Sequence, residues 1–109
     1  MAKVAFRLKV KEGQQQEYIR EHQNVWPELL SIIKEAGIHN YSIFLDDRDL
    51  FLYCEVKGST EDFVEAWKRI QATEISKKWS ERMTTLLEPA RGIGETAAPP
   101  LIKQIFYME

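Results

Sequence analysis

Residues 18–30 read Tyr-Ile-Arg-Glu-His-Gln-Asn-Val-Trp-Pro-Glu-Leu-Leu, and this stretch decides how the segments around it are interpreted. Side chains four positions apart lie on the same face of a helix, so Tyr18 and His22 share a face that continues to Trp26. The charged side chains of the stretch fall on the opposite face. The spacing therefore predicts an amphipathic helix whose inward stripe carries an imidazole next to a phenol.

Two interpretations of His22 stay open at this point. A single histidine on an inward helix face is more often a hydrogen-bonded core residue than a catalyst, and a nearby tyrosine often only anchors the helix to its sheet. Pro27 favours a polar pocket instead, because proline cannot donate to the helix ladder and disfavours helical backbone at Trp26. The helix must kink or restart there, and the carbonyl groups left without partners suit the edge of a hydrated cavity.

Four further segments alternate apolar and polar side chains with the period of two that is typical of strands. They are residues 3–10, 38–46, 50–57 and 101–108. The second and third are separated only by a short polar turn, which indicates an antiparallel hairpin.

Three helical segments lie between these strands. The first spans residues 14–36 and is interrupted near Pro27. The second begins at residue 59 with Ser-Thr-Glu-Asp, a sequence typical of a helix-capping box. The third ends near residue 87 and is followed by a loop, rich in proline and glycine, that runs to residue 100.

The order of elements is β-α-β-β-α(α)-β, which predicts an α+β fold, a ferredoxin-like βαββαβ sandwich in a single domain over residues 1–109. Helices would cover one face of the antiparallel sheet. The other face keeps several apolar side chains, and an uncovered apolar face of this kind is normally an interaction surface. We therefore expect a homodimer formed face to face through the sheets.

Composition narrows the class of function. A chain of 109 residues can bury one hydrophobic core and needs neither a disulfide nor a metal to fold. The formal net charge of −2 supplies no basic field for nucleic acid or an acidic membrane, and no apolar run approaches the roughly 18 residues of a membrane span. Cys54 is the only cysteine, which fits a reducing compartment. We expect a cytoplasmic protein with no nucleic-acid or membrane partner.

Few residues could perform chemistry. His22 and His39 lack the spacing of a metal site, no dinucleotide fingerprint is present, and Cys54 lies within a strand, where burial would make its thiol inert. For Tyr41 to meet the first helix it must point to the helix-covered face, and strand alternation then turns His39 and Ile43 the same way.

Tyr18, His22 and Tyr41 could then converge, with Trp79 from the last helix as a flat apolar wall. A tryptophan on a helix stripe is normally core filler, so this geometry alone is a weak indication. The combination would suit a monosaccharide, because sugar hydroxyls need donors and acceptors and the C–H face of the ring needs an aromatic surface.

The motifs also form a recognisable pattern. The runs are Tyr18-x3-His22-x3-Trp26-Pro27-Glu28-Leu29 and Gly37-x-His39-Asn40-Tyr41-x-Ile43-x-Leu45-Asp46, with Ala5-Phe6 near the start and Ile105-Phe106-Tyr107 near the end. This pattern resembles the L-rhamnose mutarotase family. The resemblance is clear over residues 4–56 and in the last predicted strand, and looser over residues 58–100.

The resemblance implies a dimeric α+β barrel and an enzyme that interconverts the α and β anomers of L-rhamnose by transient ring opening, without a cofactor. It makes His22 the catalytic proton donor and Tyr18, Tyr41 and Trp79 substrate-binding residues. Where the family has a tandem tryptophan pair on the third helix, this chain has Lys78-Trp79. That departure leaves another 6-deoxyhexose, or a different sugar, open as the substrate.

Two other classes of function also stay open. Small dimeric α+β barrels serve as cofactor-independent monooxygenases or haem-degrading enzymes as well, and a fold does not by itself fix a function. A sugar-binding module without turnover would show the same cluster of aromatic and polar residues.

Overall fold

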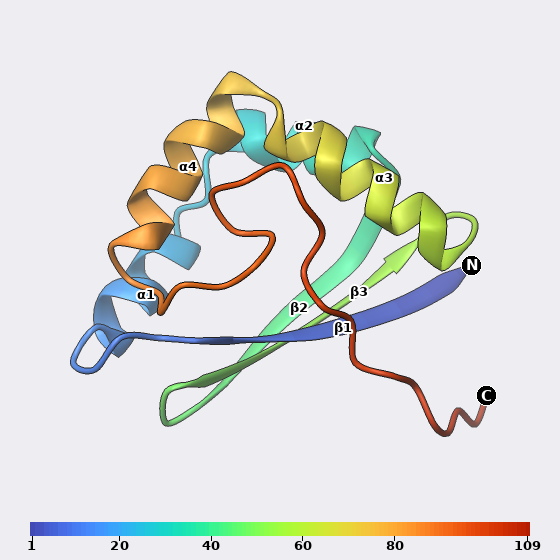
Figure 1. Ribbon diagram of the computed structural model, residues 1–109, viewed down its shortest axis with the longest axis horizontal. Helices are drawn as coiled ribbons and strands as arrows, with labels where there is room; N and C mark the ends of the chain where they lie inside the picture. The colour runs from blue at the N-terminus through green and yellow to red at the C-terminus, as the bar shows by residue number, and fades with distance from the viewer.

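The computed structural model describes residues 1–109 and consists of a three-stranded antiparallel sheet whose one face is covered by four helices (Figure 1). The elements are β1 (Ala2–Lys9), α1 (Gln15–His22), α2 (Pro27–Glu35), β2 (Ile38–Asp46), β3 (Asp49–Val56), α3 (Thr60–Gln71) and α4 (Glu74–Thr84). The predicted α+β class is confirmed. None of the helices has the length and apolar composition needed to span a bilayer.

The sheet has the strand order β1-β3-β2, with β3 paired antiparallel to both neighbours. The predicted hairpin is therefore formed by β2 and β3. Phe6, Leu52 and Ile43 lie side by side across the three strands, and the first two are almost completely buried. The period of two thus turns one face of the sheet into the floor of the core.

One irregularity in β2 changes which side chains face the helices. The register shifts between His39 and Ser42, where Asn40 has a positive φ of 49°. Such a bulge adds one residue to a strand and reverses the alternation beyond it. Ile38 and Tyr41 therefore both pack with the core, whereas His39 pairs with Glu55 on the other side of the strand. The prediction that His39 shares the face of Tyr41 is wrong, because alternation holds only in an unbroken ladder.

The predicted interruption of the first helical segment is present. α1 ends at His22 and α2 begins at Pro27, with extended backbone at Trp26 (φ −61°, ψ 131°). Proline is well tolerated at the first position of a helix, where the N–H group would have no helical partner. The chain turns between the two helices, and His22 lies directly before this turn.

α3 closes the core over β1. Its start is the predicted capping box, in which the Ser59 side chain accepts from the N–H of Asp62 and the Asp62 carboxylate accepts from the N–H of Ser59. The rings of Phe6 and Trp67 meet edge to face at 5.3 Å. Trp67 Nε1 also donates to the carbonyl of Gly92 at 2.9 Å, which fixes the loop that follows α4 against the helix.

The predicted last strand, residues 101–108, is not formed. Leu101 makes a single bridge to Phe6, and the N–H of Ile102 donates to the carbonyl of Ala5 at 2.7 Å. Beyond this point the chain leaves the edge of β1 and has no regular structure (Figure 1). Alternation predicted a strand correctly in the other segments because each found a neighbour to pair with, whereas this one lacks a partner after Ile102.

The face of the sheet opposite the helices carries exposed aromatic side chains. Phe44 and Phe51 pair directly across β2 and β3, and their side chains are 63% and 41% exposed. Ile105 and Phe106 of the C-terminal segment are also largely exposed. Phe44 and Phe51 thus form an apolar patch on this face that nothing in one chain covers.

Candidate functional site

The end of α1 holds His22 in one orientation. Its ring stacks on the ring of Tyr18, with centroids 4.1 Å apart and an angle of 29° between the planes. Nδ1 lies 2.9 Å from the carbonyl oxygen of Tyr18, and since a carbonyl can only accept, Nδ1 carries the hydrogen. In the neutral imidazole the lone pair is therefore on Nε2, which makes no hydrogen bond within the protein.

Burial lowers the pKa of His22, while the hydrogen bond to the Tyr18 carbonyl and the charge of Glu21 oppose the shift. A lowered pKa means that the neutral form dominates at neutral pH. The imidazole is thus ready to accept a proton at Nε2 and, once protonated, becomes a good donor.

His22 lines a cavity of about 770 Å³ that lies between the helices and the edge of the sheet. Ten of its sixteen lining residues are hydrophobic. Leu29 and Ile33 of α2, Tyr41 of β2 and Trp79 of α4 form parts of its wall. A partly open, largely apolar cavity of this size can accommodate a monosaccharide.

Tyr41 and Tyr18 differ in their relation to this cavity. Tyr41 lines it, whereas Tyr18 lies behind the His22 ring and is not part of the lining. Neither hydroxyl has a hydrogen-bond partner in the protein, yet no side-chain oxygen sealed from solvent lacks a partner. Both hydroxyls therefore reach space that water can enter. Burial raises the pKa of both tyrosines, so both stay protonated and can act as hydrogen-bond donors.

Trp79 places an indole beside the imidazole. Its ring meets that of His22 edge to face at 5.4 Å and that of Trp26 at 5.2 Å. The residue before it, Lys78, is exposed and does not line the cavity. The lysine that departs from the family pattern is therefore on the surface in this chain.

A polar contact connects α1 with α4. Arg82 donates from Nε to Glu21 at 3.2 Å and from a terminal nitrogen to Glu17 at 3.3 Å. Glu17 and Glu21 lie on the helix that carries His22, and Arg82 lies one turn after Trp79. The ion pairs thus help to set the position of the indole relative to the imidazole.

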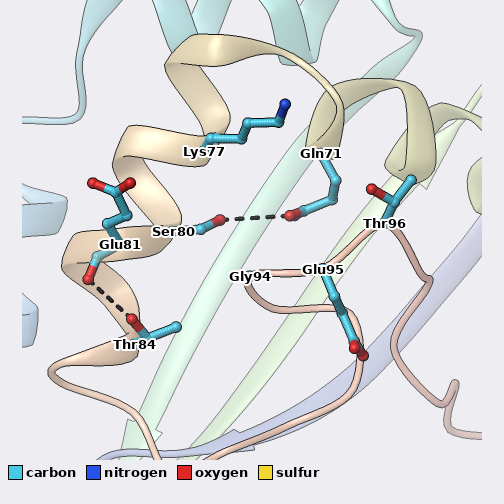
Figure 2. A pocket seen from close by; sticks show the side chains of 8 residues that line it. All are labelled: Gln71, Lys77, Ser80, Glu81, Thr84, Gly94, Glu95 and Thr96. Atoms are coloured by element: carbon cyan, nitrogen blue, oxygen red, sulfur yellow. Dashed lines mark hydrogen bonds between the residues drawn. The ribbon is translucent and has the colours of Figure 1, made fainter.

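A second, polar hollow of about 340 Å³ adjoins the cavity, and no hydrophobic residue lines it. It lies between α4 and the loop at residues 94–96 (Figure 2). Gln71 lines both hollows, and Figure 2 shows its side chain directed at Ser80, whose hydroxyl donates to Oε1 at 3.5 Å.

Gln71 and Ser76 are polar residues of the cavity wall that were not among the predicted site residues. The sequence could have indicated Ser76 as a site residue, because Ser76 precedes Trp79 by three positions and so lies on the same face of the helix. Gln71 has no comparable local signal, since only the packing of α3 against α4 brings it to the cavity.

The remaining candidates for chemistry lie outside this cluster. Cys54 is buried, and burial raises the pKa of its thiol to about 12, so it stays a thiol at neutral pH. His39 lies at the rim of the cavity, where its Nδ1 contacts the carbonyl of Gly37. Nowhere do three histidine, cysteine or acidic side chains gather so that they could hold a metal ion.

Comparison with known proteins gives a consistent result. The sequence profile of a family described as L-rhamnose mutarotase matches residues 3–108. The L-rhamnose mutarotase of Escherichia coli O157:H7 is 33% identical over 108 residues, which cover 99% of both chains. That of Lachnoclostridium phytofermentans is 39% identical over 88 residues, covering 81% of this chain and 82% of the relative.

A solved structure agrees with the sequences. The crystal structure of an L-rhamnose mutarotase from Formosa agariphila superposes with a TM-score of 0.77 at 30% identity, and the match covers all of both chains. A profile match over nearly the whole length, together with full-length similarity in sequence and in fold, shows that the chain belongs to the L-rhamnose mutarotase family.

Proposed function

We propose that this protein interconverts the α and β anomers of L-rhamnose by opening and closing the sugar ring, with His22 transferring the proton and with no cofactor. The observation that carries the proposal is the orientation of His22. Its Nδ1 is engaged by the Tyr18 carbonyl, so that Nε2 is free in a cavity large enough for a monosaccharide. The choice of L-rhamnose as the sugar rests on the matched family, which is described as L-rhamnose mutarotase.

The chemistry follows from what a hemiacetal requires. One proton must leave the anomeric hydroxyl and one must reach the ring oxygen as the bond from the anomeric carbon to that oxygen breaks. Neutral His22 accepts the first proton at Nε2, and as an imidazolium it donates a proton to the ring oxygen. Rotation of the aldehyde and the reverse steps give the other anomer. Proton transfer by a positioned side chain typically accelerates a reaction about 10²–10⁴-fold.

The aromatic residues around His22 would hold the substrate. The Tyr41 hydroxyl, which lines the cavity and lacks a protein partner, is free to bind a sugar hydroxyl. Trp79 offers an apolar surface for the C–H face of the ring. Tyr18 supports the imidazole from behind and could share a proton relay through its own hydroxyl.

Saturation-transfer NMR at anomeric equilibrium tests the proposal. In the presence of the protein, magnetisation should pass between the α- and β-anomer proton signals of L-rhamnose faster than in buffer. A panel that adds L-fucose and common hexoses decides which sugar is used. Line broadening without exchange would make the protein a sugar-binding module, and activity that depends on oxygen or haem would support the monooxygenase or haem-degrading alternatives.

We further propose that the protein is a cytoplasmic homodimer joined through the outer face of the sheet. The exposed pair Phe44 and Phe51, with the uncovered C-terminal segment beside β1, supports this assembly because a second copy would remove the apolar surface from water. The single buried Cys54 fits a reducing compartment. Light scattering during size-exclusion chromatography measures the mass directly, and a monomer at micromolar concentration would contradict the dimer.

A further inference from the structure

The polar groups of the cavity are not confined to His22 and Tyr41. Gln71, the last residue of α3, and Ser76, in the first turn of α4, also line it at the corner where the two helices meet. Most of the wall around them is apolar, including Ile70. Polar side chains in such a wall are costly unless they find hydrogen-bond partners.

Ser76 is only 3% exposed, yet its hydroxyl makes no hydrogen bond within the protein. Its backbone N–H donates to Thr73 Oγ1, which caps the helix without using the Ser76 side chain. Because no side-chain oxygen sealed from solvent lacks a partner, the Ser76 hydroxyl must open to the cavity.

The Gln71 side chain is held by a hydrogen bond from α4. Its Oε1 accepts from the hydroxyl of Ser80, a residue only 6% exposed (Figure 2). The amide N–H groups of Gln71 have no partner in the protein. Ser80 therefore acts as a positioning residue that sets the direction of an amide at the edge of the cavity.

The spacing on α4 places Ser76 within reach of a sugar that stacks on Trp79. The two residues are three positions apart and so lie on the same face, separated by about 4.5 Å along the helix axis. Both residues line the cavity, so a pyranose ring stacked on the indole would have the Ser76 side chain next to its edge.

We propose that Ser76 and Gln71 bind a ring hydroxyl of the sugar other than the anomeric one, and so determine which monosaccharide is accepted. The inference rests on the proposed mutarotase function. The anomeric hydroxyl has to meet His22, so the hydroxyl at the α3–α4 corner comes from another ring carbon. A serine hydroxyl and an amide together supply a donor and an acceptor, which a hydroxyl group can satisfy at once.

The test measures both the affinity and the anomer exchange rate for L-rhamnose and its 2-, 3- and 4-deoxy analogues. We expect Ser76→Ala and Gln71→Leu each to raise the dissociation constant and KM for L-rhamnose about 3–10-fold, with kcat within about twofold of the parent. The parent should discriminate against one deoxy analogue, and this discrimination should shrink in both variants. Thr84→Ala removes a hydroxyl from the polar hollow only, so it is the matched control and should behave like the parent.

Ser80→Ala distinguishes positioning from direct contact. It should weaken binding in the parent but have no further effect in the Gln71→Leu background, because its action passes through the amide. Parental affinities in the Ser76 and Gln71 variants, or an equal loss for all analogues, would overturn the inference while the mutarotase function stands. A parent that binds L-rhamnose without exchanging its anomers would instead refute the function, and the affinities, measured by titration calorimetry, would still decide the role of the two residues.

Discussion

The two faces of the sheet are incomplete in opposite ways. On the helix-covered face, polar groups of His22, Tyr41 and Ser76 open into a cavity without partners from the protein. On the other face, Phe44 and Phe51 expose apolar rings to solvent. The helix-covered, inner face has polar groups without hydrogen-bond partners, which a sugar can supply. The outer face has apolar side chains in contact with solvent, which a second copy can cover.

This contrast separates catalysis from assembly within a small fold. The residues proposed for chemistry lie on α1, β2 and α4, whereas the proposed dimer surface uses the opposite sides of β2 and β3. β2 contributes to both, because successive side chains of a strand point to opposite faces. Changes on one face should therefore leave the function of the other largely intact, and the following predictions examine that separation.

The largest effect is expected from His22→Asn. Asparagine keeps a polar side chain of similar reach but cannot cycle between base and acid, so anomer exchange should fall about 10²–10⁴-fold toward the buffer rate. Saturation-transfer NMR measures the loss. The thermal midpoint and the molecular mass should match the parent, and exchange at the parental rate would refute the assigned role.

Phe44→Lys examines the outer face. A lysine buried in the proposed interface would lose hydration without gaining a partner, so the dimer dissociation constant should rise about tenfold or more. Sedimentation equilibrium measures it. Gln16 is an exposed residue of α1, so Gln16→Lys adds the same charge there and is the matched control. An unchanged dissociation constant in Phe44→Lys would place the interface elsewhere.

The pH profile reports on the inner face. Because burial lowers the pKa of His22, kcat/KM should be constant near pH 7–8 and should fall about tenfold per pH unit once the pH drops below that pKa, on the acid side of about 6.5. Glu21→Gln removes a charge that raises this pKa, so the midpoint should move to lower pH. A midpoint that moves to higher pH in this variant would contradict the electrostatic picture.

Arg82→Met should have the smallest effect. The ion pairs to Glu17 and Glu21 are partly exposed, and such pairs contribute up to about 1 kcal/mol, so kcat/KM should fall about two- to fivefold. The change also leaves Glu21 without its cation, so the pH midpoint should rise. Lys77→Met removes a cation from the same helix that pairs only with Glu74, and it should leave both quantities unchanged.

Local signals predicted much of the fold. The break at Pro27 and the cap formed by Ser59 and Asp62 depend on backbone chemistry within a few residues, and both were correct. Alternation did not predict the bulge at Asn40. The sequence did contain a signal for it: Ile38 and Tyr41 are three positions apart, so they cannot both face the core in a regular strand. Residues 101–108 have the alternating pattern of a strand but do not form one. A strand needs a neighbouring strand to pair with, and the sequence pattern does not show whether one is present.

The candidate site could be predicted only in part for the same reason. Helix spacing related Tyr18 to His22, and the structure brings Tyr41 and Trp79 close to His22 from two other elements, β2 and α4. Their roles remain predictions for experiment. Gln71 reaches the cavity through the packing of α3 on α4, and such a long-range contact leaves no trace in the local pattern of residues.

The ionic link between α1 and α4 has a consequence for how the enzyme should respond to salt. L-Rhamnose carries no charge, so its capture gains nothing from electrostatic steering and should be insensitive to ionic strength. The pairs of Arg82 with Glu17 and Glu21 are partly open to solvent and are screened as salt is added. A modest decline of turnover in concentrated salt, absent from Arg82→Met, would therefore measure how far the two helices rely on their charges to stay aligned.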